Sequence, residues 1–273
     1  MDPYEIDREK QYLQNKMKVV SILKKNPEAF GKIHTERAKN DKDILNAFLK
    51  GLIYKKDKFL FLRIGELGVP YDFCCTDDFL LAEAAISGLG YIHMKQLGKT
   101  DLIDDELIYT TIANLREEKE RTGSAGIFSM FMLSGIPDDR LTENICFEIL
   151  MLHPPAVIRL PEKFFRDSLF QRLLDNGNAR WLDVGDLPYK KGFGEISLSE
   201  MFGNLSPDTI KRAVYMQREF FHPGETAVLS EKELSYISLR LPYKYKYIAY
   251  EDPEQLNLFD RIDGTDVNGQ FGI

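Results

Sequence analysis

The sequence contains little cysteine, histidine and tryptophan, and it has no long apolar run. Its 273 residues include three cysteines, four histidines and one tryptophan. Cys74, Cys75 and Cys146 form no Cys-x-x-Cys pair, which favours reduced, packed thiols in a reducing cytosol over a disulfide framework or a zinc site. Neither a stretch of membrane-spanning length nor an apolar N-terminal segment is present. We therefore expect a cytoplasmic protein, either of the cell that makes it or of a host cell that it enters.

A basic charge balance is absent as well. The formal net charge is −7, from 36 Lys and Arg against 43 Asp and Glu, whereas nucleic-acid-binding proteins present a clustered basic face. Residues 243–247 alternate Tyr with Lys, which is compatible with base stacking but also with an exposed strand or short helix. The acidic residues Glu251 and Asp252 follow closely. We expect no direct nucleic-acid binding and no membrane partner.

The sequence contains no motif whose residue types and spacing indicate catalysis or metal binding. No His-x-x-x-His or His-Glu-x-x-His pair is present, and the histidines are scattered and lack a local carboxylate partner that would poise a base. Cys74 and Cys75 precede Thr76 at the start of a predicted helix, where a thiolate would be favoured, yet packing is the simpler interpretation. The sequence thus predicts a non-enzymatic protein with no cofactor and no metal site. The four histidines are His34, His93, His153 and His222.

Apolar residues recur at helical spacing through most of the chain. Segments 76–86 and 142–150 each begin with a Thr suited to cap a helix, followed by acidic residues that the helix dipole favours. Ser230-Glu231-Lys232-Glu233 matches a capping box. Phe59–Ile64 is compatible with a strand but fits a buried helix. Six apolar positions are predicted to face the interior: Leu80, Ala84, Ile145, Ile149, Leu169 and Leu173.

After several of these helices comes a Gly or Pro break and a shorter second segment. The unit period is roughly 25 residues where units adjoin, which is typical of helical repeats. We predict an all-α fold of stacked short helix pairs with solenoid-like repeats over residues 1–250, interrupted by loops near 116–126 and 186–205. Residues 251–273 are predicted to form a flexible C-terminal tail. The second segments are Asn26–Ile33, Gly90–Leu97, His153–Glu162 and Ala179–Val184.

The stretch from Thr142 to Asp186 resembles a helical-repeat family of unknown function found in bacterial, phage and secreted effector proteins. The resemblance covers about half of the chain and is weaker over 76–115. It implies a stack of helix pairs and no particular activity. The matching residues are Cys146, Pro155-Ala156, Leu160-Pro161-Glu162, Arg166-Asp167, Asn176-Gly177 and Trp181-Leu182.

The C-terminal segment resembles the peptide by which bacterial replication and repair proteins dock on the sliding clamp. Gln255, Leu256, Leu258 and Phe259 match its Gln-Leu-x-Leu-Phe pattern. The resemblance implies that the Gln is held by hydrogen bonds while Leu and Phe fill an apolar pocket of the clamp. A short apolar anchor in a polar tail is a common way to present a peptide ligand. The alternative is that these side chains pack against the chain's own last helices.

Three hypotheses about function follow. The first is a non-enzymatic adaptor or inhibitor from a phage or mobile element, acting in replication, repair or host defence by binding a protein partner such as the clamp. The second is a secreted or phage-encoded effector enzyme whose site is assembled from residues distant in sequence. The third is a partner-binding scaffold whose tail only packs. An apolar surface poor in carboxylates favours the first, and an acidic groove with several perturbed titratable groups favours the second.

Overall fold

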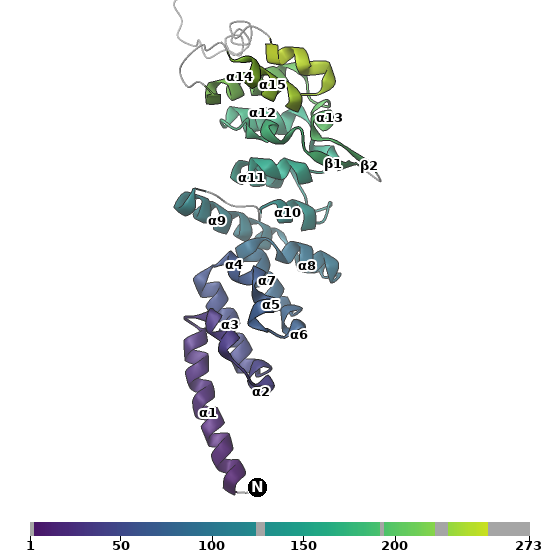
Figure 1. Ribbon diagram of the computed structural model, residues 1–273. Coiled ribbons are helices and arrows are strands. Elements are labelled where there is room, and N and C mark those ends of the chain that lie inside the picture. The colour runs from purple at the N-terminus through teal and green to yellow at the C-terminus, as the bar shows by residue number, and fades with distance from the viewer. Residues whose placement is uncertain (1–2, 124–128, 192–193, 222–228, 251–273) are drawn as a thin grey trace, which may run out of the picture. The chain divides into compact units, whose positions relative to one another are not determined.

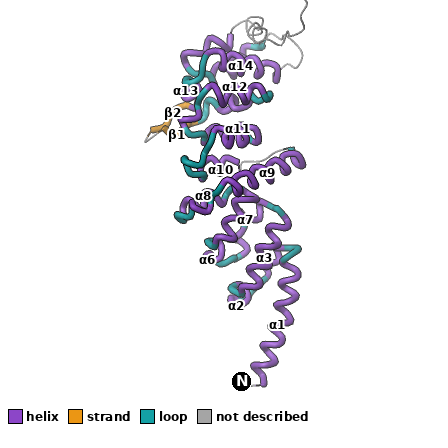
Figure 2. Tube along the Cα trace, turned by 180° about the vertical axis from the view of Figure 1, so that it is seen from behind, coloured by secondary structure: helices purple, strands orange, loops and turns teal. Residues whose placement is uncertain are grey.

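The protein is predominantly helical, as the sequence predicts. The computed structural model describes residues 3–123, 129–191, 194–221 and 229–250, which form helices and, within these ranges, one two-stranded sheet (Figures 1 and 2). The chain divides into two compact units, Met1–Arg140 and Leu141–Ile273. Each unit has its own buried apolar core.

The first unit consists of α-helices of very different lengths joined by short turns. Short side chains cap several of them, since the carboxylate of Asp41 accepts from two amides of α3 and that of Asp104 from one amide of α9. In order along the chain, the elements are α1 (Pro3–Leu23), the 3₁₀ helix η1 (Pro27–Lys32), α2 (Glu36–Lys39), α3 (Lys42–Lys55), α4 (Lys58–Leu62), α5 (Ile64–Leu67), α6 (Tyr71–Cys74), α7 (Asp77–Ser87), α8 (Gly90–Gln96), η2 (Thr100–Leu102), α9 (Asp105–Thr122) and α10 (Ser129–Gly135).

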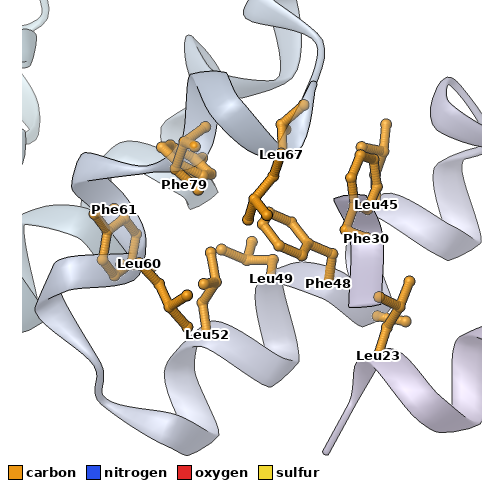
Figure 3. Packing of buried hydrophobic residues seen from close by; sticks show 14 of the residues in the cluster. Leu23, Phe30, Leu45, Phe48, Leu49, Leu52, Leu60, Phe61, Leu67 and Phe79 are labelled. Carbon is orange, nitrogen blue, oxygen red and sulfur yellow. The ribbon is translucent and has the colours of Figure 1, made fainter. Parts of the chain in front are cut away.

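Aromatic and aliphatic side chains from α1 to α7 form a continuous core (Figure 3). The rings of Phe30 and Phe48 lie with their centroids 4.9 Å apart, and those of Phe61 and Phe79 lie 5.7 Å apart edge to face. Burying a side chain of this size stabilises the fold by about 1.5–3 kcal/mol. The segment Phe59–Ile64 is therefore helical, as the sequence favours, with Phe59–Leu62 in α4 and Ile64 at the start of α5. Its burial is partial, because Phe59 and Leu62 are exposed.

Glycines allow α7, α8 and α10 to pack at very short range. Gly88 ends α7 with a left-handed φ of 72°. A Cβ on Gly90 would lie 2.4 Å from the amide nitrogen of Ala84, and one on Gly135 would lie 2.5 Å from the carbonyl carbon of Tyr91. α8 is thereby held against α7 on one side and α10 on the other.

The second unit consists of α-helices, short 3₁₀ helices and a two-stranded hairpin. α11 packs against α12 and α12 against α14, while η3 packs against η5. The elements are α11 (Glu143–Leu152), η3 (Pro154–Arg159), η4 (Glu162–Phe164), α12 (Asp167–Asp175), η5 (Arg180–Val184), β1 (Pro188–Lys191), β2 (Gly194–Ser197), α13 (Leu198–Phe202), α14 (Pro207–Phe221), α15 (Glu231–Arg240) and η6 (Tyr243–Tyr250).

The core of the second unit centres on Trp181, which is fully buried. Its ring lies 4.7 Å from that of Phe170 and 4.9 Å from that of Phe202, both edge to face. Such aromatic edge-to-face pairs add to the stabilisation that burial itself provides. A buried polar side chain also connects two segments of this core, because Asn178 donates a hydrogen bond to the carbonyl of Leu150 in α11.

Most of the local predictions are confirmed. All six positions predicted to face the interior are buried. The second segments are short helices, three of them 3₁₀ helices (η1, η3 and η5) and the fourth the α-helix α8. The capping box at Ser230 and Glu233 is present. Near 116–126, α9 continues to Thr122 and ends at Gly123 with φ 80°, and residues 124–128 lie outside the described ranges.

The prediction of a loop over 186–205 is wrong. The segment contains an antiparallel hairpin in which Pro188 pairs with Ser197 and Lys191 with Gly194, followed by α13. Tyr189 is buried and its hydroxyl donates to the carbonyl of Leu160, 2.7 Å away. Of the glycines that indicate a loop, Gly194 begins β2 and Gly203 ends α13, whereas Gly192 lies outside the described residues.

Candidate functional site

The four residues of the clamp-like motif lie outside the described residues. Gln255, Leu256, Leu258 and Phe259 all belong to the segment 251–273. Two surfaces within the described part of the chain have features of a binding site. One is a pocket in the first unit, and the other is an exposed aromatic surface at the end of the second unit.

The pocket of the first unit has a volume of about 510 Å³ and lies among α4 to α8. This volume falls in the range of about 300–1,000 Å³ that is typical of ligand sites. Phe61 and Phe79, which belong to the core, form part of its wall, and Tyr71 lies at its exposed rim. Because most of the wall is apolar, the few polar groups in it decide what the pocket can bind.

The main polar feature of the pocket is a hydrogen-bonded pair, Glu83 of α7 and His93 of α8. Glu83 Oε2 lies 2.7 Å from His93 Nδ1. Glu83 is only 2% exposed, whereas the His93 side chain is 45% exposed. The hydrogen bond to Glu83 raises the pKa of His93 more than partial burial lowers it. The pocket therefore holds a buried carboxylate beside an imidazole whose positive charge this carboxylate favours.

This pair corrects the sequence interpretation that the histidines lack a carboxylate partner. Glu83 and His93 are ten residues apart, on two helices that the turn at Gly88 folds against each other. Their proximity depends on that packing and not on a spacing within one helix. The sequence signal for this pair is the Gly88–Gly90 turn between two apolar helical segments, because such a turn predicts that the two helices pack as neighbours.

Cys74 of the pocket lacks the environment of a reactive thiolate. Cys74 is the last residue of α6, and Cys75 caps that helix and directly precedes Thr76, the N-cap of α7. Burial, followed by the negative charge of Glu83, raises the pKa of Cys74 to about 12. The thiol of Cys74 is thus neutral at physiological pH.

Other residues considered from the sequence are not brought into this pocket. His34 and His153 do not line it, and His222 lies outside the described residues. Across the described ranges, no cluster of three or more His, Cys, Asp or Glu side chains is suited to hold a metal ion. No helix in those ranges has the length and apolar character needed to cross a membrane.

The second surface lies on α15 and η6, which pack against each other. Tyr243, Tyr247 and Tyr250 of η6 are 90%, 54% and 59% exposed, and Leu239 of α15 is 60% exposed. The opposite side of η6 is anchored in the core, where the buried Tyr245 donates to the carbonyl of Leu205. The alternation of Tyr and Lys noted in the sequence is therefore neither a strand nor uniformly exposed.

The exposed tyrosines are directly followed in the chain by the segment that contains the clamp-like motif. An aromatic surface and a peptide anchor are thus separated by only a few residues of sequence. Comparisons of the chain with protein-family models, with curated proteins and with solved structures found no match.

Proposed function

We propose that this protein is a non-enzymatic, protein-binding adaptor or inhibitor of the cytoplasm, encoded by a bacterial mobile element or phage. Its C-terminal segment docks on the replication sliding clamp or on another macromolecular partner, such as a host-defence complex. The observation that carries the proposal is the row of exposed tyrosines on η6, immediately before the motif of Gln255, Leu256, Leu258 and Phe259.

Exposed tyrosines held on a rigid support suit a protein interface. Tyr is among the residues that contribute most to binding energy, because its large ring loses little conformational entropy on contact. Tyr245 and Ile248 anchor η6 in the core, so its backbone needs no ordering when a partner binds. The tail and η6 together would engage one partner at two adjacent points.

The helical architecture agrees with this role. In the second unit, α11 packs against α12 and α12 against α14, and α11, α12 and α15 are each followed by one or more 3₁₀ helices, which supports a solenoid-like stack of helix pairs like that of the family described above. Repeats of this kind present extended surfaces to macromolecular partners.

The enzyme hypothesis has one observation in its favour, the pair of Glu83 and His93 in a pocket. A nucleophile would have to act beside it, and Cys74 in the pocket wall is a candidate. Since the pKa of that thiol is raised to about 12, it is not activated for attack. The pocket contains a single carboxylate and is therefore not the acidic groove that would favour the enzyme hypothesis.

The test is a titration of the sliding clamp against wild type and against the double variant Leu258→Ala/Phe259→Ala. We expect the variant to lose clamp binding, because each buried apolar side chain contributes about 1.5–3 kcal/mol. Its helix content and melting temperature should match those of wild type. Lowered stability together with no clamp binding by wild type would mean instead that the segment packs on its own chain.

A second variant examines the tyrosine surface separately. Tyr247→Ser/Tyr250→Ser should weaken clamp binding severalfold without changing the melting temperature, because both side chains are more than half exposed. Tyr245→Ser is the matched control, since it removes a buried ring of the same helix and should lower stability. Unchanged affinity of the first variant would remove η6 from the interface. Single-stranded DNA should bind to none of these proteins.

A further inference from the structure

The pocket of the first unit combines aromatic walls with a buried carboxylate. Phe61, Phe79 and Tyr71 supply rings, and Glu83 supplies the charge. A buried carboxylate is costly unless an opposite charge accompanies it. Here that charge comes from His93, whose imidazole is nearly half exposed and can lose its proton.

We propose that this pocket binds a small organic cation with an apolar body, such as an aromatic ammonium, through Glu83 and the surrounding rings. The ammonium donates hydrogen bonds to the carboxylate, and the apolar body fills the space against Phe61 and Phe79. Aromatic faces attract cations as well as apolar groups, which adds to the selectivity for a positive charge. The site is independent of the tail and of η6.

Glu83 is the charged group of the pocket wall that a ligand cation would contact, because the nearby lysines are paired with other carboxylates. Lys99 pairs with Asp77 at 2.6 Å, and Lys58 at the start of α4 pairs with Glu118 at 2.8 Å. Cys74 and Tyr71 are neutral, since both have raised pKa values, and Cys75 contributes a thiol to the wall. Thus His93 is the cation that competes with the ligand for Glu83.

This competition makes binding depend on pH in a defined direction. When His93 is protonated, the carboxylate already has its counter-charge. As the pH rises through the pKa of His93, the imidazolium loses its proton and the carboxylate becomes free to accept a ligand cation. The affinity for a cation should therefore increase with pH, and bound cation should lower the pKa of His93.

The experiment uses three probes with one indole ring: tryptamine, a cation; tryptophol, which is neutral; and indole-3-propionate, an anion. Affinities for the full chain are measured by calorimetry at about pH 6, below the ordinary histidine pKa of about 6.5, and at about pH 8.5, well above it. We expect tryptamine to bind about tenfold more tightly than tryptophol at the higher pH, because a hydrogen bond between two charged groups contributes enough free energy for about a tenfold gain in affinity. This preference should shrink at the lower pH.

Variants assign the effect to particular side chains. Glu83→Gln should abolish the preference for tryptamine over tryptophol, whereas His93→Gln should keep the preference and remove its pH dependence. Glu66→Gln is the matched control, because Glu66 is an exposed carboxylate of α5, paired with Arg63, and does not line the pocket. It should bind tryptamine as wild type does. A thermal melt of each variant verifies folding.

Three outcomes would overturn the proposal. Equal affinities of tryptamine and tryptophol at both pH values would show that charge is not recognised. A preference for indole-3-propionate would show that His93 selects an anion. Binding of none of the three probes to the folded wild type at millimolar concentration would show that the pocket holds no ligand of this kind.

Discussion

At the scale of single residues, the pair of Glu83 and His93 makes stability depend on pH. The pKa of His93 is raised in the folded protein by its hydrogen bond to Glu83. The pair therefore stabilises the fold fully below the unfolded pKa of about 6.5, and this contribution is lost as the pH rises through the folded pKa. Wild type should exceed His93→Gln in unfolding free energy at low pH, and the difference should shrink as the pH rises through the folded pKa of His93.

Urea unfolding of both proteins across this pH range measures the difference. A titration of the His93 imidazole followed by NMR gives its pKa in the folded protein. This pKa should agree with the midpoint of the pH dependence of the difference in unfolding free energy. A difference that stays constant from acidic to alkaline pH would mean that His93 contributes by packing alone.

At the scale of elements, two threonines in equivalent sequence positions differ in what they do. Thr142 accepts a hydrogen bond from the amide of Ile145, 3.2 Å away, and so caps α11. The hydroxyl of Thr76 instead donates backwards to the carbonyl of Phe73 and makes no cap bond to α7. Thr142→Ala should cost about 1 kcal/mol of unfolding free energy, measured by denaturant titration. Thr76→Ala is the control and should cost less; an equal cost would contradict this distinction.

The short-range packing of α8 and α10 gives a second prediction at this scale. Gly135→Ala places a methyl group 2.5 Å from the backbone of Tyr91, so it should destabilise the first unit by about 1–3 kcal/mol or more. Gly65→Ala in α5 meets no atom within 4 Å and should be neutral or slightly stabilising. Melting temperatures of the two variants provide the comparison. Equal effects would mean that the helices separate to accept the methyl group.

Helix positions and buried faces could be predicted from the sequence because their causes are local. Ile145, Ile149 and Leu173 recur at helical spacing, and caps and Gly or Pro breaks lie at the ends. The hairpin was missed because its strands are only four residues long and polar, and Tyr189 is held by a distant carbonyl. The Glu83–His93 pair was missed because it requires α7 and α8 to be packed together.

At the scale of the whole molecule, the two compact units should fold separately. Each is of ordinary domain size and has its own apolar core. We expect the fragment 1–140 to give a helical circular dichroism spectrum and a cooperative thermal transition. The fragment 141–273 should do the same. A fragment that is unfolded alone but folds when mixed with the other would show that the units depend on each other.

The single tryptophan makes the second unit optically distinguishable from the first. Trp181 is fully enclosed by Phe170 and Phe202, so its emission should be blue-shifted in the native protein and move to longer wavelength only when that enclosure opens. The first unit contains no tryptophan. Fluorescence excited at the red edge of indole absorption therefore reports the opening of one half of the chain, whereas far-ultraviolet dichroism averages both.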